Sequence, residues 1–333
     1  MRVGLLGGGH IADQYIAGMR QFEELELVAV ADRDVDVTRA RAAEWNLRAH
    51  TPESLLAAGD VELVVNLTPP RAHPETTRDA LTAGKHVYSE KPLGVDVDEA
   101  RELVELARAK RLGLACAPDT FLGSALETAR DALLASAIGT PLSATAFVGE
   151  RGPEHWHPSP AAYYERGAGP LFSLGPYYLT ALVQLLGPIE EATGFSSQPW
   201  DKRSRPDGTT MPVSTQTTYA GALRFANGVV GTVFASYDVQ EKRVPPLEIY
   251  GSEATLSLPD PNHFDGPVLL GDATGWRELP VTHATGRGRG VGVADLARAL
   301  VDGGEPRASG KLALHVLDAL CALHEGGRRL VPT

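Results

Sequence analysis

Short, continuous runs of apolar residues alternate with helix-like stretches over the first third of the chain. The runs are RVGLL, LVAVA, ELVVNL, HVYSE and GLACA, and the stretches between them cover 11–21, 35–45, 72–83 and 96–110. Strands that alternate with helices are typical of crossover units, and continuous apolarity indicates strands covered on both faces. Residues 1–120 are therefore predicted to form an α/β domain with a doubly wound parallel sheet.

The pattern changes after 137–141, where Thr- and Val-rich runs replace the alternation. Asn227-Gly228 joins two of these runs and is a favoured hairpin turn. Strands are predicted at 141–149, 213–225, 229–239, 246–251, 254–258, 267–271 and 276–281, and helices at 291–302 and 309–325. Residues 121–333 are thus predicted to form an α+β domain with a large open, mainly antiparallel sheet. For the long polar segment 199–212, a lid, an oligomer arm and a disordered loop remain open.

The run 229–239 has no clearly polar face. Val230, Thr232, Phe234 and Ser236 share one side of the expected strand, and apolar residues are spread over both. An open sheet with such a face is usually covered. We therefore expect a homodimer or homotetramer that forms through this sheet.

Length and composition narrow the class of protein. A chain of 333 residues fits two domains, and its net charge of -11 argues against nucleic-acid binding. No apolar run approaches the roughly 18 residues of a membrane span, and the apolar start leads into glycines without a cleavage site. Cys116 and Cys321 are far apart, which favours neither a disulfide framework nor a zinc site. A reducing cytoplasm is the expected location.

A glycine motif follows the first predicted strand. The segment GGGHIA fits G-x-G-x-x-A and opens a helix-like stretch, which is the context that a Rossmann dinucleotide site requires. Gly7 would allow the tight turn, Gly9 the approach of a pyrophosphate, and Ala12 close packing of helix and strand. His10 and Ile11 would present helix N-terminal N–H groups to the phosphates. A glycine turn without a ligand is the alternative.

Twenty residues after Ala12, the run LVAVAD ends in Asp32. A carboxylate at this place accepts hydrogen bonds from the adenosine ribose and repels a 2′-phosphate, which favours NAD. Arg33 is placed to meet a 2′-phosphate, so NADP stays an alternative. Asp32 is also a candidate N-cap for the helix at 35–45.

The run HVYSEKPLG places Lys91 where ligands gather in parallel sheets, at the carboxyl end of a strand. Pro92 favours an extended backbone at Lys91 and so fixes the direction of its side chain. A lysine beside a nicotinamide can donate a hydrogen bond to a substrate oxygen and stabilise an alkoxide. A solvated surface lysine is the alternative.

The combination of GxGxxA, Asp32, NLTPP at 66–70 and EKP at 90–92 resembles the glucose-fructose oxidoreductase, inositol dehydrogenase and MocA-like family, Gfo/Idh/MocA. The resemblance covers the whole chain and implies a Rossmann domain followed by an open-sheet domain that forms oligomers. It also implies that Lys91 is the catalytic lysine. The cofactor-contacting set would then include Leu67, Thr68, Pro69, His73, Glu90 and Lys91. For His73, a polar residue at a helix start remains the alternative.

Many members of the family carry a stretch G-G-x-L-x-D-x-G-x-H, whose Asp and His lie with the lysine around the substrate carbon. On AGPLFSLGPYY at 168–178, these positions hold Ser173 and Tyr177. A phenol donates a proton to a carbonyl oxygen, and a nearby lysine lowers its pKa from about 10. We therefore expect Tyr177 to act as the acid beside Lys91, with packing on a helix face as the alternative.

The segment just before this stretch, GPEHWHPSPAAYYERGAG, offers rival groups. His155 and His157 are rival acid–base candidates, and Trp156 and Tyr164 would form an apolar face against a sugar ring. Two histidines without a third ligand do not indicate a metal, and none is expected.

These residues predict an enzyme of the CH–OH dehydrogenase or reductase class that depends on NAD, with NADP as the alternative cofactor. It would transfer a hydride between the nicotinamide and a sugar, polyol or keto-sugar carbon. One alternative is a redox-neutral sugar isomerase or glycosidase that keeps its NAD bound. Another is a non-catalytic regulator that senses a cofactor or sugar.

Overall fold

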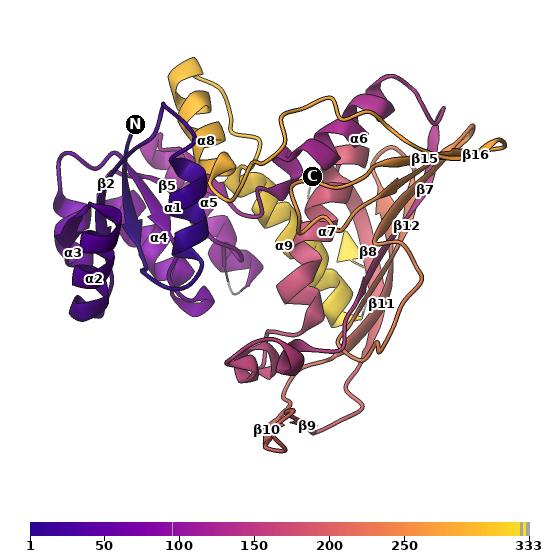
Figure 1. Cartoon of the computed structure of the whole chain (residues 1–333), viewed down its shortest axis with the longest axis horizontal. Helices are drawn as coiled ribbons and strands as arrows, with labels where there is room; N and C mark the ends of the chain where they lie inside the picture. The colour runs from indigo at the N-terminus through magenta and orange to yellow at the C-terminus, as the bar shows by residue number, and fades with distance from the viewer. Residues whose placement is uncertain (95, 327–328, 331–333) are drawn as a thin grey trace. The chain divides into compact units, whose positions relative to one another are not determined.

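The computed structural model describes residues 1–94, 96–326 and 329–330 and divides into two compact units (Figure 1). Unit 1 comprises Met1–Leu122 and Gly286–Leu317, and unit 2 comprises Gly123–Thr285 and the chain from Asp318 onward. The units differ from the contiguous division 1–120 and 121–333 because a late segment returns to unit 1.

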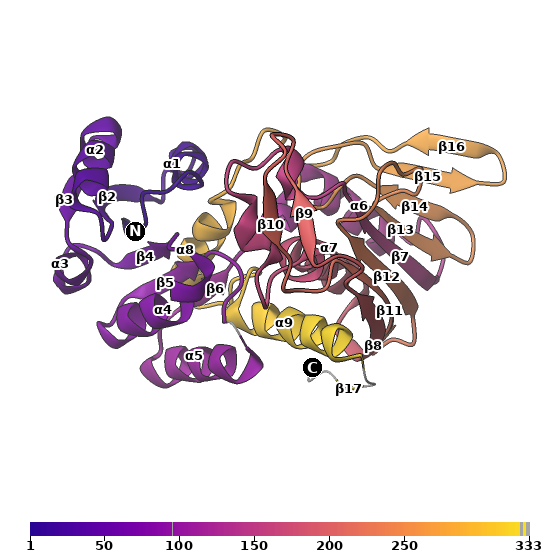
Figure 2. The same cartoon turned by 90° about the horizontal axis from the view of Figure 1, so that it is seen from below.

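Unit 1 is a six-stranded sheet in the order β3-β2-β1-β4-β5-β6, and all of its neighbouring strands pair in parallel. Its strands are β1 Arg2–Leu6, β2 Glu26–Ala31, β3 Arg48–His50, β4 Leu63–Asn66, β5 His86–Ser89 and β6 Leu114–Cys116. Its helices are α1 Ala12–Met19, α2 Val35–Trp45, α3 Pro52–Ala57, α4 His73–Thr82, α5 Val97–Lys110 and α8 Val291–Asp302. Figure 2 shows α4 and α5 on the side of this sheet opposite α1. The predicted doubly wound sheet is confirmed.

Side-chain caps define where several of these helices begin. Asp34 accepts hydrogen bonds from two N–H groups at the start of α2, and Asp96 caps α5 by accepting from the Glu99 N–H. Asp34, and not Asp32, is therefore the N-cap of the helix predicted at 35–45. The sequence pattern missed α3 and β3 because both are short, and β3 is a polar edge strand.

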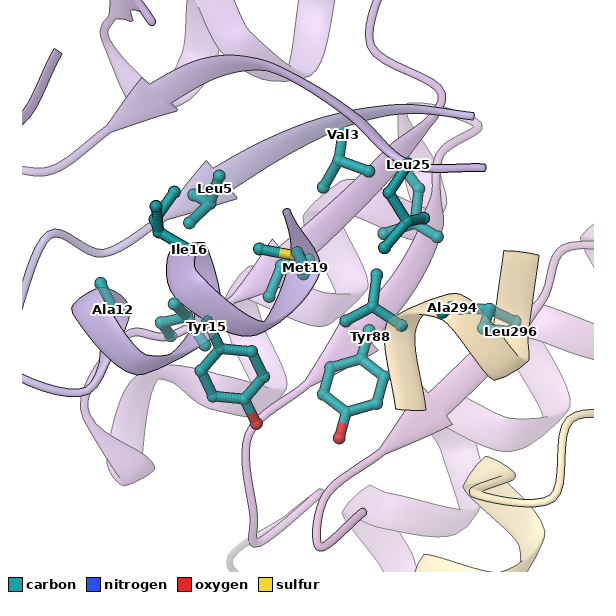
Figure 3. Close-up of a cluster of buried hydrophobic side chains, with 14 of the residues drawn as sticks. Val3, Leu5, Ala12, Tyr15, Ile16, Met19, Leu25, Tyr88, Ala294 and Leu296 are labelled. Carbon is teal, nitrogen blue, oxygen red and sulfur yellow. The ribbon is translucent and has the colours of Figure 1, made fainter. Parts of the chain in front are cut away.

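The core on one face of the unit 1 sheet explains why α8 belongs here. Val3 and Leu5 of β1 point toward α1, and Ala294 of α8 lies in the same cluster (Figure 3). The N-terminus of α8 is also tied to the sheet, because the buried Asp119 carboxylate accepts from the N–H groups of Gly290 (2.9 Å) and Gly292 (3.1 Å).

Unit 2 is built on a nine-stranded sheet in the order β16-β15-β14-β13-β7-β12-β11-β8-β17. The strands are β7 Pro141–Gly149, β8 Ile189–Ser197, β11 Thr218–Phe225, β12 Val230–Ser236, β13 Leu247–Gly251, β14 Thr255–Leu258, β15 Leu269–Asp272, β16 Gly275–Glu278 and β17 Arg329–Leu330. Its helices are α6 Ser124–Leu134, α7 Pro170–Leu186 and the C-terminal half of α9 Gly310–Glu325. These helices lie on one side of the sheet (Figures 1 and 2).

The predicted open, mainly antiparallel sheet is confirmed, with one parallel strand pair. β7 and β12 pair in parallel, although all other neighbours pair antiparallel. The turn at Asn227-Gly228 joins β11 to β12 as predicted. The segment 199–212 contains a small hairpin, β9 Lys202–Ser204 and β10 Thr210–Pro212, so it is not a structureless loop. The pattern missed β8.

The face of this sheet away from the helices carries an apolar row. Phe195, Ala220, Phe234 and Phe147 stand in register on four neighbouring strands, and the Phe147 and Phe234 rings stack at 4.7 Å. The Phe195 side chain is 84% exposed. Among the described residues, no helix is both long and apolar enough to cross a bilayer.

Candidate cofactor and substrate sites

The glycine loop of unit 1 lies where the strand order reverses between β1 and β4. Gly7 has φ +106, and a Cβ there would stand 2.6 Å from the Leu67 carbonyl oxygen. Its N–H donates to the Ala31 carbonyl at 2.9 Å. The turn thus needs glycine both for its conformation and for its approach to the chain that follows β4. This reversal point is where ligands bind in doubly wound folds.

Open space surrounds the next part of the loop. A Cβ added at Gly9 would meet no atom within 4 Å, and both Gly9 and His10 are exposed. Ile11 is the N-cap of α1, and no side chain among the described residues caps it. Helix N-terminal N–H groups and room for close approach suit an anionic pyrophosphate, so these residues fit a dinucleotide.

The carboxylate of Asp32 is hydrogen-bonded to the glycine loop. Its Oδ2 accepts from the Gly8 N–H at 2.8 Å, and its Oδ1 accepts from the Asp34 N–H at 3.0 Å. The sequence analysis missed Arg41 of α2, whose Nε donates to the Gly8 carbonyl at 3.0 Å. Arg33 is exposed beside Asp32.

Asn66 organises the loop that follows β4. Its Oδ1 accepts from the N–H (3.2 Å) and hydroxyl (2.7 Å) of Thr68, and its Nδ2 donates to the His73 carbonyl and the Thr77 hydroxyl, both at 3.1 Å. Leu67 is buried and Pro69 is exposed. The side chain of Asn66, which the sequence analysis did not single out, thus fixes the backbone of the expected nicotinamide-contacting loop.

His73 links this loop to the one that carries Lys91. It starts α4 and is 1% exposed. Its Nε2 lies 2.7 Å from the Thr68 carbonyl oxygen, and its Nδ1 lies 2.8 Å from that of Pro92. Burial lowers the pKa of His73, although both carbonyls oppose this effect.

Glu90 fixes the backbone next to Lys91. Its carboxylate accepts from the Tyr15 hydroxyl at 2.8 Å and from the Lys91 N–H at 2.9 Å. The Tyr15 ring meets the Tyr88 ring edge to face at 6.0 Å, and both rings are labelled in Figure 3. The sequence analysis gave Tyr15 no role, because a tyrosine on a helix face has no distinguishing signal.

Lys91 itself is half-buried at the carboxyl end of β5. Burial lowers the pKa of Lys91, Glu90 opposes this shift, and the cation of Arg289 adds to it. A lysine with a lowered pKa is a better proton donor near neutral pH.

In unit 2, helix α7 presents the two positions singled out in the sequence. Gly169 precedes it with φ +90, where a Cβ would stand 2.6 Å from the Gln216 carbonyl oxygen. Tyr177 is 6% exposed. The Ser173 hydroxyl makes a hydrogen bond with the phenol of Tyr237, a buried tyrosine at the end of β12. Position 173 therefore holds a hydroxyl that engages a phenol.

The candidate residues in the turns before α7 differ in how deeply they are buried. Tyr164 is 1% exposed, and its hydroxyl donates to Glu154. Trp156 is 61% exposed and meets the rings of His157 (5.4 Å) and Tyr163 (6.0 Å) edge to face. Trp156 is thus available as a flat apolar surface, whereas the hydroxyl of Tyr164 serves the loop itself.

A cavity of ≈ 430 Å³ opens beside Trp156 and is lined entirely by unit 2. Its polar walls are Glu150, Arg151, His155, Gln240, Glu241 and Lys242. In the part of the chain that the structure describes, no group of three or more His, Cys, Asp or Glu side chains is arranged to hold a metal.

Two family models match consecutive parts of the chain. The model of an oxidoreductase family with an NAD-binding Rossmann fold covers residues 1–116, and the GFO/IDH/MocA C-terminal domain model covers 126–257. The chain belongs to the Gfo/Idh/MocA family. Its first unit is therefore an NAD-binding Rossmann domain, in agreement with the predicted family and cofactor.

Curated relatives in the family include sugar enzymes. The chain is 27% identical over 289 residues to the 1,5-anhydro-D-fructose reductase of Ensifer adhaerens, covering 85% of this chain and 84% of that protein. It is 28% identical over 272 residues to the D-glucoside 3-dehydrogenase of Escherichia coli K12, covering 78% and 77%. A solved levoglucosan dehydrogenase with NADH and L-sorbose has the same fold, with a TM-score of 0.84, 21% identity and coverage of 100% and 99%.

Proposed function

We propose that this Gfo/Idh/MocA protein oxidises a sugar or polyol, or reduces the corresponding keto-sugar, with a nicotinamide cofactor. The bound nicotinamide would exchange a hydride with the carbinol carbon of the substrate. The observation that carries the proposal is the presence, in one unit, of the glycine loop and of Lys91 with a lowered pKa. Sugar enzymes among the relatives support the substrate class.

Asp32 supports NAD as the preferred cofactor. Its carboxylate adjoins the glycine loop, where it would accept the ribose hydroxyls and repel a 2′-phosphate. The exposed Arg33 keeps NADP as the alternative. Titration calorimetry with NAD and NADP tests this preference, and an Asp32→Ala variant should narrow the difference between them.

Lys91 would polarise the substrate oxygen. When a ketone accepts the hydride, negative charge develops on that oxygen, and an ammonium group with a lowered pKa stabilises the charge and readily gives up a proton. In the oxidation direction, the same amine would take the hydroxyl proton.

Tyr177 would relay this proton as the acid, in place of the histidine that many family members carry. Phenols donate more readily than they accept at neutral pH, so we propose ketone reduction as the working direction. His155 and His157 remain rival donors. A Tyr177→Phe variant with unchanged turnover would remove this part of the proposal.

The first test is the reduced-nicotinamide absorbance of the purified protein. NAD or NADP would be given with sugars and polyols, and NADH or NADPH with keto-sugars, with Lys91→Ala as the control. A Lys91-dependent change supports the proposal and identifies the cofactor and substrate class. No change, despite cofactor binding, would favour a redox-neutral isomerase or glycosidase, or a regulator that carries out no chemistry.

We also propose that the apolar row on the outer face of the unit 2 sheet is the homodimer or homotetramer surface. An 84% exposed phenylalanine in a row of aromatic side chains is unfavourable in water. Light scattering would show a smaller species for a Phe195→Glu variant. Cys116 and Cys321 are not joined in a disulfide, which supports a reducing cytoplasm as the location.

A further inference from the structure

The cavity beside Trp156 lies at the ends of the only parallel strand pair described in unit 2. β7 and β12 run side by side and end together at Gly149 and Ser236. The pairing continues past both strands, because the Glu150 N–H donates to the Ser236 carbonyl (2.9 Å) and the Val239 N–H donates to the Glu150 carbonyl (3.1 Å). Both the N–H and the carbonyl of Glu150 are therefore held by the segment that ends β12, and Glu150 lines the cavity.

The carboxylate of Glu150 has an unusual set of neighbours. Burial and the nearby carboxylate of Asp260 raise the pKa of Glu150, and the cation of Lys242 opposes the shift. Burial is the main cause of the raised pKa of three tyrosines, Tyr163, Tyr178 and Tyr237, and the negative charge of Glu150 adds to the shift in each. One of them, Tyr237, is the phenol that Ser173 engages. The backbone of Glu150 pairs with Ser236, the residue before Tyr237, so the strand end that carries Glu150 adjoins the phenol that Ser173 engages at the position where the family pattern has an aspartate.

The turn that carries Trp156 and lines the cavity is held in place by a buried network of charged side chains. Tyr164 donates to Glu154, and Arg203 lies 3.7 Å from Glu154 and 2.9 Å from Asp238. Gly152, with φ +101, packs directly on this network, since a Cβ there would stand 2.5 Å from the Tyr164 hydroxyl oxygen. The cavity is therefore held in shape by the protein before any ligand enters.

These groups suit an uncharged, hydroxyl-rich ring. An aromatic face binds the C–H side of a sugar, and a carboxylate accepts from adjacent hydroxyls through charge-assisted hydrogen bonds. Arg151 and Lys242 are exposed at the cavity, whereas Glu150 and Asp260 are half-buried. Glu150 lines the cavity and Asp260 lies near it, and because a charge acts most strongly where water is displaced, these half-buried carboxylates disfavour an anionic ligand.

We propose that Glu150 is a specificity-determining residue that binds the hydroxyls of a neutral sugar or polyol, lying on Trp156, and selects it over the corresponding sugar acid. The inference rests on the proposed function and names the substrate class for it. It also explains how the chain manages without a carboxylate at position 173: a carboxylate from the strand end takes over the hydrogen bonding to the substrate.

The test measures sugar binding separately from turnover. Saturation-transfer NMR on the NADH-bound protein would rank D-glucose, D-galactose, myo-inositol and D-glucuronate, and steady-state kinetics would follow with the neutral ligand that binds. Glu150→Gln should raise the Kd and KM for the neutral ligand about ten- to a hundredfold, which is the loss of a charge-assisted hydrogen bond. Glu150→Asp should retain part of the affinity. Glu190→Gln, an exposed carboxylate on β8 away from the cavity, is the matched control.

A pH profile separates a direct contact from a structural role. The neutral ligand needs the ionised carboxylate, so KM should rise as the pH falls through the raised pKa of Glu150 and should lose this dependence in Glu150→Gln. Equal affinity in wild type and Glu150→Gln, tighter binding of glucuronate, or no binding of any neutral sugar would overturn the inference. Glu150-dependent binding without any redox turnover would instead contradict the proposed reaction and leave the inference standing.

Discussion

The two units build their candidate sites in different ways. In unit 1, the glycine loop, Asp32, Thr68 and Lys91 all follow the carboxyl ends of parallel strands and are held mainly by hydrogen bonds to the backbone. In unit 2, side chains from turns, from α7 and from strand ends hold one another, as in the contact between Ser173 and Tyr237. A site whose loops are held by hydrogen bonds to the backbone tolerates few substitutions. In a site whose side chains hold one another, one hydrogen-bond donor can be replaced by another. This difference accounts for the intact EKP motif beside the altered positions 173 and 177.

The largest effect should come from the residue of unit 1 that does chemistry. Lys91→Ala removes the group that stabilises charge on the substrate oxygen, and kcat/KM should fall about a thousandfold. Cofactor affinity, followed by NADH fluorescence, should fall far less than kcat/KM, because Lys91 is one of many residues of the cofactor-contacting set. Lys110→Ala, an exposed lysine at the end of α5, is the control. A Lys91→Ala enzyme within threefold of wild type would show that unit 1 only binds the cofactor.

Two glycines of the same loop separate folding from cofactor binding. Gly7→Ala forces a side chain into a left-handed conformation against the Leu67 carbonyl and should lower the free energy of unfolding by about 2–4 kcal/mol. Gly9→Ala meets no protein atom, so it should leave the stability unchanged and weaken NAD binding. Urea denaturation and calorimetry measure the two effects. Equal NAD affinity in Gly9→Ala and wild type would contradict the pyrophosphate site.

In unit 2, Tyr177→Phe should lower kcat about a hundredfold with little change in KM, because it removes a proton donor and keeps the ring.

A second variant of α7, Ser173→Asp, tests the side-chain network around Tyr237. It would place a carboxylate beside the buried phenol of Tyr237, whose pKa the charge of Glu150 already raises, and added negative charge in this half-buried site should lower stability instead of improving activity. Faster turnover in Ser173→Asp would show that the chain has lost a useful carboxylate at position 173, and that the serine hydroxyl does not replace its function.

The sequence predicted that the candidate residues of unit 1 would lie at strand ends, and it could do so for a physical reason. In a parallel sheet, the carboxyl ends of all strands lie at the same edge, so motifs that follow successive strands gather at that edge even though the strand order β3-β2-β1-β4-β5-β6 differs from the chain order. Gly7, Asp32 and Lys91 could thus be assigned from their positions after apolar runs. Tyr15 and Asn66 could not, because their roles depend on which hydroxyl or carbonyl they meet once the loops have folded.

The unit 2 site could be predicted only in outline. Most of the strands followed from periodicity, but β8 was missed, and the bounds of α6 and α7 were not predicted. Nothing in the pattern distinguishes Glu150 from other surface carboxylates. Its place depends on the register of β7 against β12, a pairing between residues far apart in sequence. Trp156 is exposed as an apolar surface, whereas Tyr164 is buried and donates to Glu154. Which of the two rings is buried depends on the fold of the turns, and the local sequence does not determine it.

The smallest expected effect concerns the histidine that links the two loops of unit 1. Burial lowers the pKa of His73, so between its ordinary value of about 6.5 and its lower folded value the unfolded chain binds more protons than the folded one. The free energy of unfolding should therefore decrease as the pH falls below about 6.5, by about 1 kcal/mol over the first pH unit. Urea denaturation of wild type and His73→Gln between pH 7 and 5 isolates this contribution, because His86, whose pKa burial also lowers, is present in both. A wild type that gains stability relative to His73→Gln on acidification would instead mean that a charged ring donates to the Thr68 and Pro92 carbonyls at once, and that the link between the loops strengthens in acid.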